Sequence, residues 1–327
     1  MKTVFIVNPT AGKGKKLKQL EAHLQELVKT NQGDVDRYYT KAVGDATRFV
    51  REYCEKNGAA RFIACGGDGT FSEVVNGVLD YKEAEVGVVP VGSGNDFCRN
   101  FPVETDFHNV ALQVSSDWMP CDVIRYTTKV EGKVITGVCT NMFNIGFDCN
   151  VADKTNALKE KTVFGGSFAY VISIFWNLIQ KKCTNLRIAL DGVKQHDGKL
   201  LLTSIANGSY CGGGIKSNPL SSVTDGKINV NIIKNVSRLR FLSLLPSYMK
   251  GTHMKRKGIE RILKCYSCHR MSITPASGTV RLCIDGEIIT AGETRFDVIP
   301  GGIRLVVPGC FKKSGGFQTP VCETVGL

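Results

Sequence analysis

The fold is decided by the stretch from residue 61 to residue 77, which reads RFIACGGDGTFSEVVNG. Apolar residues 62–65 predict a short buried strand, and the glycines that follow predict a tight turn. Thr70 and Glu73 have the spacing of a capping box, so we expect a helix to begin near Thr70. The stretch therefore predicts a strand, a glycine-rich turn and a helix in succession.

The turn holds three glycines around Asp68. Backbone N–H groups at the start of a helix bind anions, most often phosphate. A tight turn with positive φ would need only one glycine, so we favour a phosphate site over a simple turn. A carboxylate would repel phosphate unless a cation lay between them. Asp68 therefore predicts Mg²⁺, held directly or through water.

The composition is typical of a soluble globular protein with a basic excess. Apolar residues make up 43% of the 327 residues, and 42 Lys and Arg against 30 Asp and Glu give a formal charge of +12. This charge suits nucleic acid, an anionic membrane surface or a polyphosphate ligand. The sequence contains no nucleic-acid-binding motif, so we expect no nucleic acid partner.

Three features lead us to expect a cytoplasmic protein. The first residues lead directly into an apolar run at 4–7, without a charged and then apolar leader. Thirteen cysteines in such a chain predict free thiols in a reducing compartment. The longest apolar run, residues 168–179, is shorter than the ~20 residues of a membrane span.

Strands and helices alternate through the first 120 residues, which predicts a parallel, doubly wound α/β domain. Ligands of such sheets bind beyond the carboxyl ends of the strands. Four loops are expected at that edge, so their convergence predicts a ligand site. The predicted strands are residues 4–7, 34–39, 62–65 and 86–91, and their loops are residues 8–16, Thr40, residues 66–70 and residues 92–97.

After Pro120 the pattern changes to short runs of β-branched and apolar residues, which predicts an antiparallel β domain. Pairs of an acidic residue and glycine supply the expected turns. These pairs are Glu131-Gly132, Asp191-Gly192, Asp197-Gly198, Asp225-Gly226 and Asp285-Gly286. Two helices are expected, at 166–182 and 238–250. The apolar, lysine-flanked part of the first either contacts anionic lipid or packs on the β domain.

Seven ordered motifs across the length of the chain resemble the bacterial diacylglycerol and lipid kinase family, in the superfamily with sphingosine and NAD kinases. The motifs are Asn8-Pro9-Thr10-Ala11-Gly12, Thr40 with Gly44-Asp45-Ala46, residues 66–76, residues 90–97, Asn141 with Gly146-Phe147-Asp148, Asp225-Gly226 and Asp285-Gly286-Glu287. The glycine-rich turn alone would be less specific, since NAD kinases carry it too.

The resemblance implies two domains. Residues 1–121, completed by about 304–327, would form a nucleotide-binding α/β domain related to phosphofructokinase and NAD kinase. Residues 122–303 would form an antiparallel β-sandwich that carries catalytic acids, with the active site in the cleft between the two. The resemblance also favours a homodimer.

The implied activity is an ATP- and Mg²⁺-dependent transfer of the γ-phosphate to a primary hydroxyl of a membrane lipid. Diacylglycerol, giving phosphatidic acid, is the favoured acceptor, and we expect peripheral contact with the anionic inner face of the membrane. Two alternatives remain open. One is a kinase of a soluble alcohol such as NAD, and the other is a non-catalytic nucleotide or lipid sensor.

The resemblance also assigns roles to residues. Glu287 would be the general base, Asp285 would support it or the metal, and Asp96 would place the hydroxyl. Asp68 would hold Mg²⁺, and Asp225 would bind a structural Mg²⁺ with carbonyl groups near Ser222 and Lys227. The nucleotide would be bound by Asn8, Pro9, Thr10, Ala11, Gly12, Thr40, Gly66, Gly67, Asp68, Gly69, Thr70, Phe71, Ser72 and Ser93. Thr224 departs from the family, because many members carry a carboxylate there.

Overall fold

The computed structural model describes residues 1–327 except 14, 31–33, 147–182, 311, 314–315 and 318–327. The chain divides into two compact units, each described here by itself. Unit 1 comprises Met1–Cys121 and Gly301–Leu327, and unit 2 comprises Asp122–Pro300. The helix expected at 166–182 and the motif residue Asp148 lie outside the described residues.

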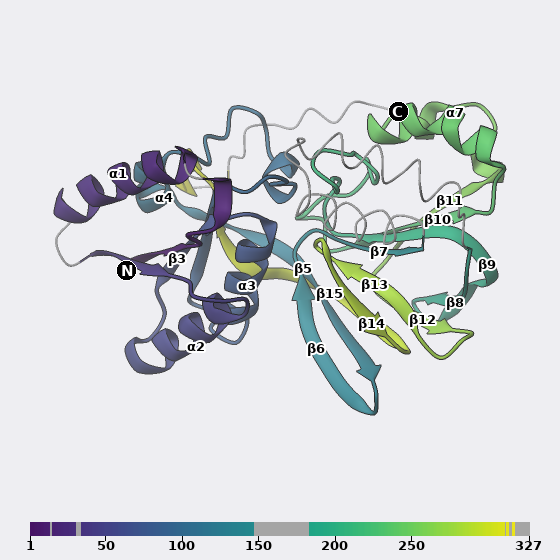
Figure 1. The fold of residues 1–327 in the computed structure, drawn as a ribbon, viewed down its shortest axis with the longest axis horizontal. Helices are drawn as coiled ribbons and strands as arrows, with labels where there is room; N and C mark the ends of the chain where they lie inside the picture. The colour runs from purple at the N-terminus through teal and green to yellow at the C-terminus, as the bar shows by residue number, and fades with distance from the viewer. Residues whose placement is uncertain (14, 31–33, 147–182, 311, 314–315, 318–327) are drawn as a thin grey trace. The chain divides into compact units, whose positions relative to one another are not determined.

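Unit 1 is built on a parallel sheet, as the alternating pattern predicts (Figure 1). Its strands, in spatial order, are β2 (Val35–Tyr39), β1 (Thr3–Val7), β3 (Arg61–Gly66), β4 (Glu85–Pro90) and the end of β15 (Thr294–Val306). β1, β3 and β4 are almost wholly buried because helices cover both faces of the sheet.

The helices of unit 1 form two groups, one on each face of the sheet (Figure 1). Leu24 of α1 and Val110 of α4 share one apolar core with Phe5 of β1. On the other face Gly77 of α3 lies so close to Val50 of α2 that an added Cβ would come within 2.7 Å of it. The helices are α1 (Lys15–Thr30), α2 (Asp45–Asn57), α3 (Asp68–Val78) and α4 (Val110–Ser115), with short 3-10 helices at η1 (Ala11–Lys13) and η2 (Phe97–Asn100).

The expected capping box of α3 is wrong. The helix begins at Asp68, two residues before Thr70, and its N-cap Gly67 has no side-chain cap. The Glu73 carboxylate instead accepts a hydrogen bond from the backbone N–H of Ala46, at the start of α2, at 3.1 Å. A contact with a neighbouring helix therefore takes the place of the local one.

Unit 2 is an antiparallel β domain, in agreement with the sequence pattern (Figure 1). Its main path runs in the order β14, β13, β7, β9, β8, β12 and β15, while β10 joins β9 to β11 and β5 joins β6 to β15. The strands are β5 (Trp118–Val130), β6 (Lys133–Cys139), β7 (Met142–Gly146), β8 (Thr184–Leu190), β9 (Val193–Ala206), β10 (Ile228–Lys234), β11 (Leu263–Cys268), β12 (Arg270–Pro275), β13 (Val280–Ile284) and β14 (Glu287–Ala291). Phe143 and Phe296 contact edge to face, with ring centroids 4.9 Å apart, in its core.

Among the described residues of unit 2, the helical segments follow β10. α7 (Arg238–Met249) is succeeded by η3 (His253–Lys255) and η4 (Ile259–Arg261). The helix expected at 238–250 is thus confirmed almost to the residue.

Three of the predicted turns are two-residue hairpins in which both residues have positive φ: Glu131-Gly132, Asp191-Gly192 and Asp285-Gly286. The turn expected at Asp197-Gly198 is wrong, because both residues lie inside β9 and pair with β8. The chain has already reversed at residues 191–192, so β9 continues through this pair.

Candidate active site

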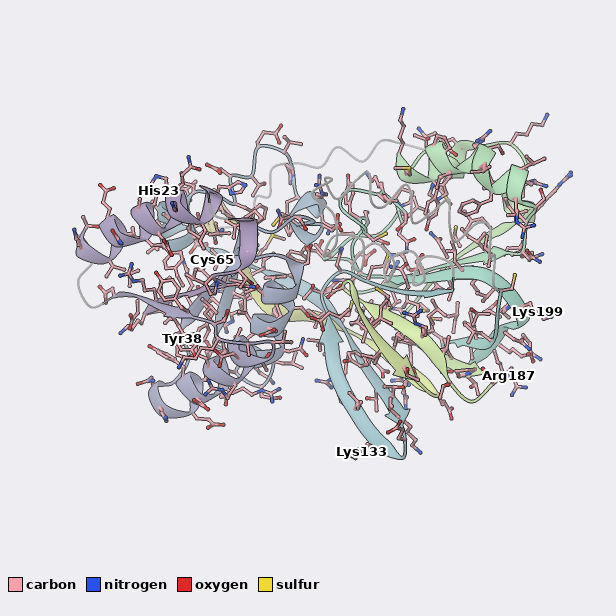
Figure 2. All side chains as sticks on the ribbon, viewed as in Figure 1. His23, Tyr38, Cys65, Lys133, Arg187 and Lys199 are labelled. Carbon is pink, nitrogen blue, oxygen red and sulfur yellow. The ribbon has the colours of Figure 1, made fainter. Side chains whose placement is uncertain are left out.

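Hydrogen bonds join the carboxyl ends of the strands of unit 1. The N–H of Asn8 donates to the carbonyl of Cys65 at 3.0 Å, and the N–H of Thr40 donates to Val7 at 2.9 Å. Figure 2 marks Cys65, near the end of β3. The Asn8 side chain reaches Thr70 Oγ1 at 3.2 Å, from the loop after β1 to the first turn of α3. The expected loops 8–16, Thr40 and 66–70 therefore meet.

Close packing accounts for part of the glycine pattern. A Cβ added at Gly92 would lie 2.4 Å from the Cα of Gly67, and one added at Gly66 would lie 2.2 Å from Thr70 Oγ1. Only glycine lets the loops after β3 and β4 approach this closely. The glycines thus bring the start of α3 against the 92–97 loop as well as leaving space for a ligand.

Two carboxylates converge on Gly94. An added Cβ there would lie 2.9 Å from Asp68 Oδ2 and 3.7 Å from Asp96 Oδ2. Asp68 Oδ1 accepts a hydrogen bond from the N–H of Phe97 at 3.2 Å, and Arg99 Nε lies 3.6 Å from Asp96. The structure therefore brings together two of the acids assigned from the family resemblance, at the N-terminus of α3.

The other predicted nucleotide residues occupy varied environments. Pro9, Thr10 and Ser93 are exposed, and Gly12 has a φ of 71°. Phe71 is buried against Phe97, with ring centroids 4.4 Å apart, so its side chain serves the core of unit 1. Ala11, Thr40, Gly69 and Ser72 are half-buried, the last two within the first turns of α3.

Asp285 of unit 2 is tied into the fold. Its carboxylate accepts five hydrogen bonds from residues 139–142, including backbone N–H groups of Thr140, Asn141 and Met142 at 2.8–3.0 Å. One of the five donors is the Cys139 thiol, at 3.0 Å. Burial and then the charge of Asp285 raise the pKa of this thiol, so it stays protonated as a donor. Asp285 therefore fixes the chain between β6 and β7 to the β13–β14 turn.

Glu287 lies two residues further on and is exposed, at the start of β14. It pairs across the hairpin with Ile284. The nearby Tyr126 hydroxyl has a raised pKa, mainly through burial, with smaller electrostatic contributions from the side chains of Cys139, Glu287 and Asp285. Sequence reasoning did not single out Tyr126, which carries no motif and comes near these acids only through strand pairing.

Asp225 has a second acid beside it. The buried Asp122 carboxylate accepts a hydrogen bond from the N–H of Gly226 at 2.6 Å, and Asp225 accepts one from Lys227 at 3.0 Å. Burial raises the pKa of Asp225, and the charge of Asp122 adds to the rise. Asp122 was expected only to mark a domain boundary. Ser222 and Thr224 are exposed, with their hydroxyl oxygens 3.2 Å apart.

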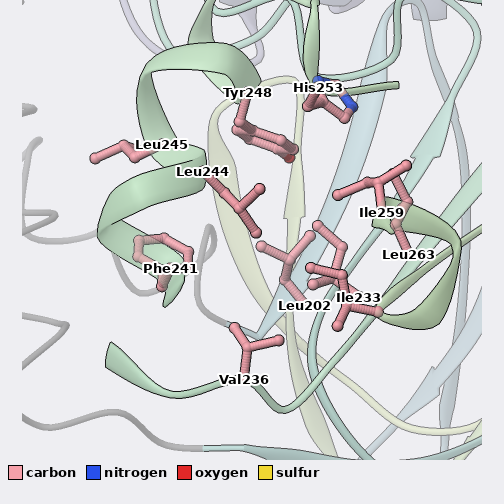
Figure 3. A pocket seen from close by; sticks show the side chains of 11 residues that line it. Leu202, Ile233, Val236, Phe241, Leu244, Leu245, Tyr248, His253, Ile259 and Leu263 are labelled. Carbon is pink, nitrogen blue, oxygen red and sulfur yellow. The ribbon is translucent and has the colours of Figure 1, made fainter. Parts of the chain in front are cut away.

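An apolar cavity lies beneath α7 in unit 2 (Figure 3). Its volume is about 30 Å³. His253 lines it beside Tyr248, with ring centroids 5.0 Å apart. Burial lowers the pKa of His253, which favours the neutral imidazole.

Among the described residues, no group of three or more His, Cys, Asp or Glu side chains is placed to hold a metal ion. The candidate cation positions, near Asp68 and near Asp225, therefore each offer two neighbouring carboxylates at most. None of the helices in the described part of the chain is long and apolar enough to cross a bilayer.

Sequence comparisons assign both halves of the chain to known families. The family described as diacylglycerol kinase catalytic domain matches residues 2–126, and the YegS C-terminal NAD kinase beta sandwich-like domain matches residues 141–307. A diacylglycerol kinase of Staphylococcus aureus is 33% identical over 258 residues, covering 77% of this chain and 76% of that protein. The chain belongs to the diacylglycerol kinase family. Another member, from Staphylococcus epidermidis, is 32% identical over 290 residues and covers 86% of this chain and 84% of its own length.

Solved structures support the same fold. A crystal structure of a putative diacylglycerol kinase from Bacillus anthracis aligns with a TM-score of 0.71 at 21% identity, over 94% of this chain and 97% of that chain. Yeast NADH kinase in complex with NADH aligns with a TM-score of 0.53 at 12% identity, over 96% of this chain and 84% of that chain. The expected combination of an α/β domain and a β-sandwich is confirmed.

Proposed function

We propose that this protein is an ATP- and Mg²⁺-dependent kinase that phosphorylates the primary hydroxyl of diacylglycerol and so produces phosphatidic acid. The observation that carries the proposal is the convergence of Asp68 and Asp96 on Gly94, beside the glycine turn that opens α3. Membership of the diacylglycerol kinase family supports the choice of acceptor.

The residues around the glycine turn suit the phosphates of a nucleotide. α3 begins without a side-chain cap, so its first N–H groups are directed toward the loops that meet there. Asn8 fixes the shape of its own loop, because its Oδ1 accepts hydrogen bonds from the N–H and the hydroxyl of Thr10 at 3.0 and 2.8 Å. ATP, when bound, would supply the phosphoryl group that is transferred.

The acids suit Mg²⁺, which prefers oxygen ligands and binds through one or two carboxylates together with substrate phosphates. Asp68 and Asp96 would hold an ion beside the phosphates and offset their charge. At the second position, burial and then the charge of Asp122 raise the pKa of Asp225, and a cation there would stabilise the charged form of Asp225. The carbonyl groups near Ser222 and Lys227 would complete its ligands.

Proton transfer would depend on Glu287. A general base must reach the hydroxyl whose proton it accepts, and an exposed carboxylate on a short hairpin is accessible to an acceptor. Asp285 anchors that hairpin through its five hydrogen bonds and would thereby position Glu287. The rest of the catalysis would be positioning and charge stabilisation, as is usual for phosphoryl transfer.

The test is the transfer of labelled phosphate from ATP to diacylglycerol in mixed micelles with Mg²⁺. Wild type should form labelled phosphatidic acid, and Glu287→Gln should lose roughly 100-fold or more of the rate. Glu293→Gln is the matched control, because this glutamate is also exposed and lies in the turn after β14. It should keep the wild-type rate. Full turnover by Glu287→Gln would reject the assigned base.

Parallel reactions separate the two remaining alternatives. Labelled product from NAD, with none from lipid, would support a kinase of a soluble alcohol, a reading for which the yeast NADH kinase supplies a likeness of fold alone. Binding of ATP without transfer to any alcohol would support a sensor.

A further inference from the structure

Helix α7 carries apolar side chains on two opposite faces. On one face Phe241, Leu244 and Tyr248 pack against the core of unit 2 and line its small cavity (Figure 3). On the other face Leu239 is 81% exposed and Leu242 is 38% exposed. Residues three and four apart share a helix face, so these two leucines lie together. A helix that is apolar on both faces is normally buried on both, and here one is open.

The sequence in and around α7 is rich in positive charge. Between residues 234 and 264 the sequence has nine basic residues and a single acidic one, Glu260. All nine basic residues are exposed: Lys234, Arg238, Arg240, Lys250, Lys255, Arg256, Lys257, Arg261 and Lys264. Such a density of one sign repels a basic partner and attracts an anionic one.

The chain after α7 folds back along the helix and brings part of this charge beside it. The N–H of Thr252 donates to the carbonyl of Ser247 at 2.9 Å. The Arg256 guanidinium donates to the carbonyl of Ser243 and lies 3.4 Å from Ser247 Oγ. The helix therefore has Arg238 and Arg240 in its first turn, Lys250 at its C-terminal end and Arg256 beside Ser243 and Ser247.

We propose that the exposed face of α7, with the basic residues around it, docks the protein on an anionic lipid bilayer. Exposed leucines bordered by lysine and arginine are typical of helices that lie in the plane of the membrane interface. The leucines would enter the acyl boundary while the basic groups contact anionic headgroups. A purely charged partner such as nucleic acid would leave the leucines in water, so the combination favours a bilayer.

The proposal deepens the proposed function and rests on it in one respect, namely that the acceptor is a lipid of such a bilayer. The docking surface uses none of the residues assigned to catalysis. Binding to vesicles without ATP and turnover of soluble substrate can therefore be measured independently of each other.

The test is sedimentation of the full chain with vesicles of phosphatidylcholine alone or mixed with phosphatidylglycerol, in the absence of nucleotide. Wild type should bind the mixed vesicles more tightly, and added salt should weaken this binding. Arg240→Gln with Lys250→Gln should weaken it about five-fold for each charge removed. Leu239→Ser with Leu242→Ser should weaken binding to both kinds of vesicle.

Matched controls lie elsewhere on the same unit. Val134→Ser removes an apolar side chain that is 62% exposed, on β6. Lys129→Gln with Lys133→Gln removes two exposed charges from the β5–β6 hairpin, whose Lys133 Figure 2 shows well away from α7. Both controls should bind vesicles as wild type does. Equal losses in the controls and the α7 variants, or no binding by wild type, would overturn the proposal.

A second measurement separates this proposal from the proposed function. With a short-chain diacylglycerol dissolved as monomers, the α7 variants should keep the wild-type rate. Vesicle binding that depends on α7, without turnover of any diacylglycerol, would support the docking surface and reject the proposed reaction. Turnover of monomeric diacylglycerol by wild type, without vesicle binding, would support the proposed reaction and reject the docking surface.

Discussion

Asp285 and Glu287 are separated by one glycine, yet their surroundings differ and favour different roles. The Asp285 carboxylate is saturated by donors from residues 139–142. Hydrogen bonds to a charged group contribute more than neutral ones, and removal of a buried acceptor leaves its donors unsatisfied. Glu287 is exposed, at the start of β14. The residue that builds the hairpin is thus distinct from the residue proposed to take the proton.

We expect Asp285→Ala to lower the free energy of unfolding by about 3 kcal/mol, because several backbone N–H groups would lose their acceptor. Glu287→Gln should change it by less than about 0.5 kcal/mol, as is usual for exposed positions. Urea unfolding followed by circular dichroism measures both. Similar values for the two variants would contradict the division of roles.

His253 makes stability depend on pH. Its pKa is lowered by burial, with the Ser247 carbonyl acting weakly in the opposite direction. In the unfolded chain the imidazole takes up a proton at about pH 6.5, whereas the folded protein resists protonation there. Stability is therefore lost as the pH falls through 6.5 toward the lower folded pKa. His253→Leu should lose less stability than wild type between pH 7.5 and pH 5, by thermal unfolding. Equal losses of stability in wild type and His253→Leu would contradict the assignment of this pH dependence to His253.

At the scale of elements, the glycine turn before α3 has a steric function as well as a proposed binding function. The loops after β3 and β4 touch through Gly67 and Gly92, with no room for a side chain on the latter. The ends of parallel strands carry ligands only when their loops are held at the right separation. This contact sets the separation, and with it the position of Gly94 between Asp68 and Asp96.

Gly92→Ala should lower the free energy of unfolding by about 1–3 kcal/mol, because its Cβ would force two backbones apart. The same displacement should weaken ATP binding. Gly67→Ala is the matched control for stability, since its Cβ would make only an ordinary contact of 3.4 Å and its φ of −94° suits any residue. Chemical unfolding and nucleotide titration test the pair, and equal stability would contradict the steric argument.

At the scale of the whole molecule, each unit supplies different chemistry. Unit 1 places two carboxylates and a helix N-terminus at the end of a parallel sheet. Unit 2 carries Glu287 on a hairpin and a second pair of acids, Asp122 and Asp225, beside the start of β10. A ligand that binds only the folded state stabilises the chain as a whole.

Mg²⁺ should therefore raise the melting temperature of the nucleotide-free protein relative to a sample in chelator. Saturation at 100 times the dissociation constant would add about 2.7 kcal/mol of stability. Asp225→Asn should remove most of this gain if the ion lies in unit 2, while Asp68→Asn should leave it. An equal gain in Asp225→Asn would place the stabilising ion elsewhere.

The local patterns of the sequence determined the elements and the fold class. Apolar runs and turn residues located β1 to β4 and α7 to within a few residues, because these signals depend on neighbours along the chain. Pairs of an acidic residue and glycine likewise located the three hairpin turns with positive φ. The carboxyl edge of the sheet followed from strand–helix alternation, and so did the meeting of its loops.

Tertiary structure decided which partner each polar group has. Glu73 bonds α2 instead of capping its own helix, and Asp285 binds a segment more than 140 positions earlier. Asp122 lies beside Asp225 for the same reason, and α7 has one open apolar face. These contacts depend on how strands and helices far apart in sequence come together, and local spacing holds no information about that pairing.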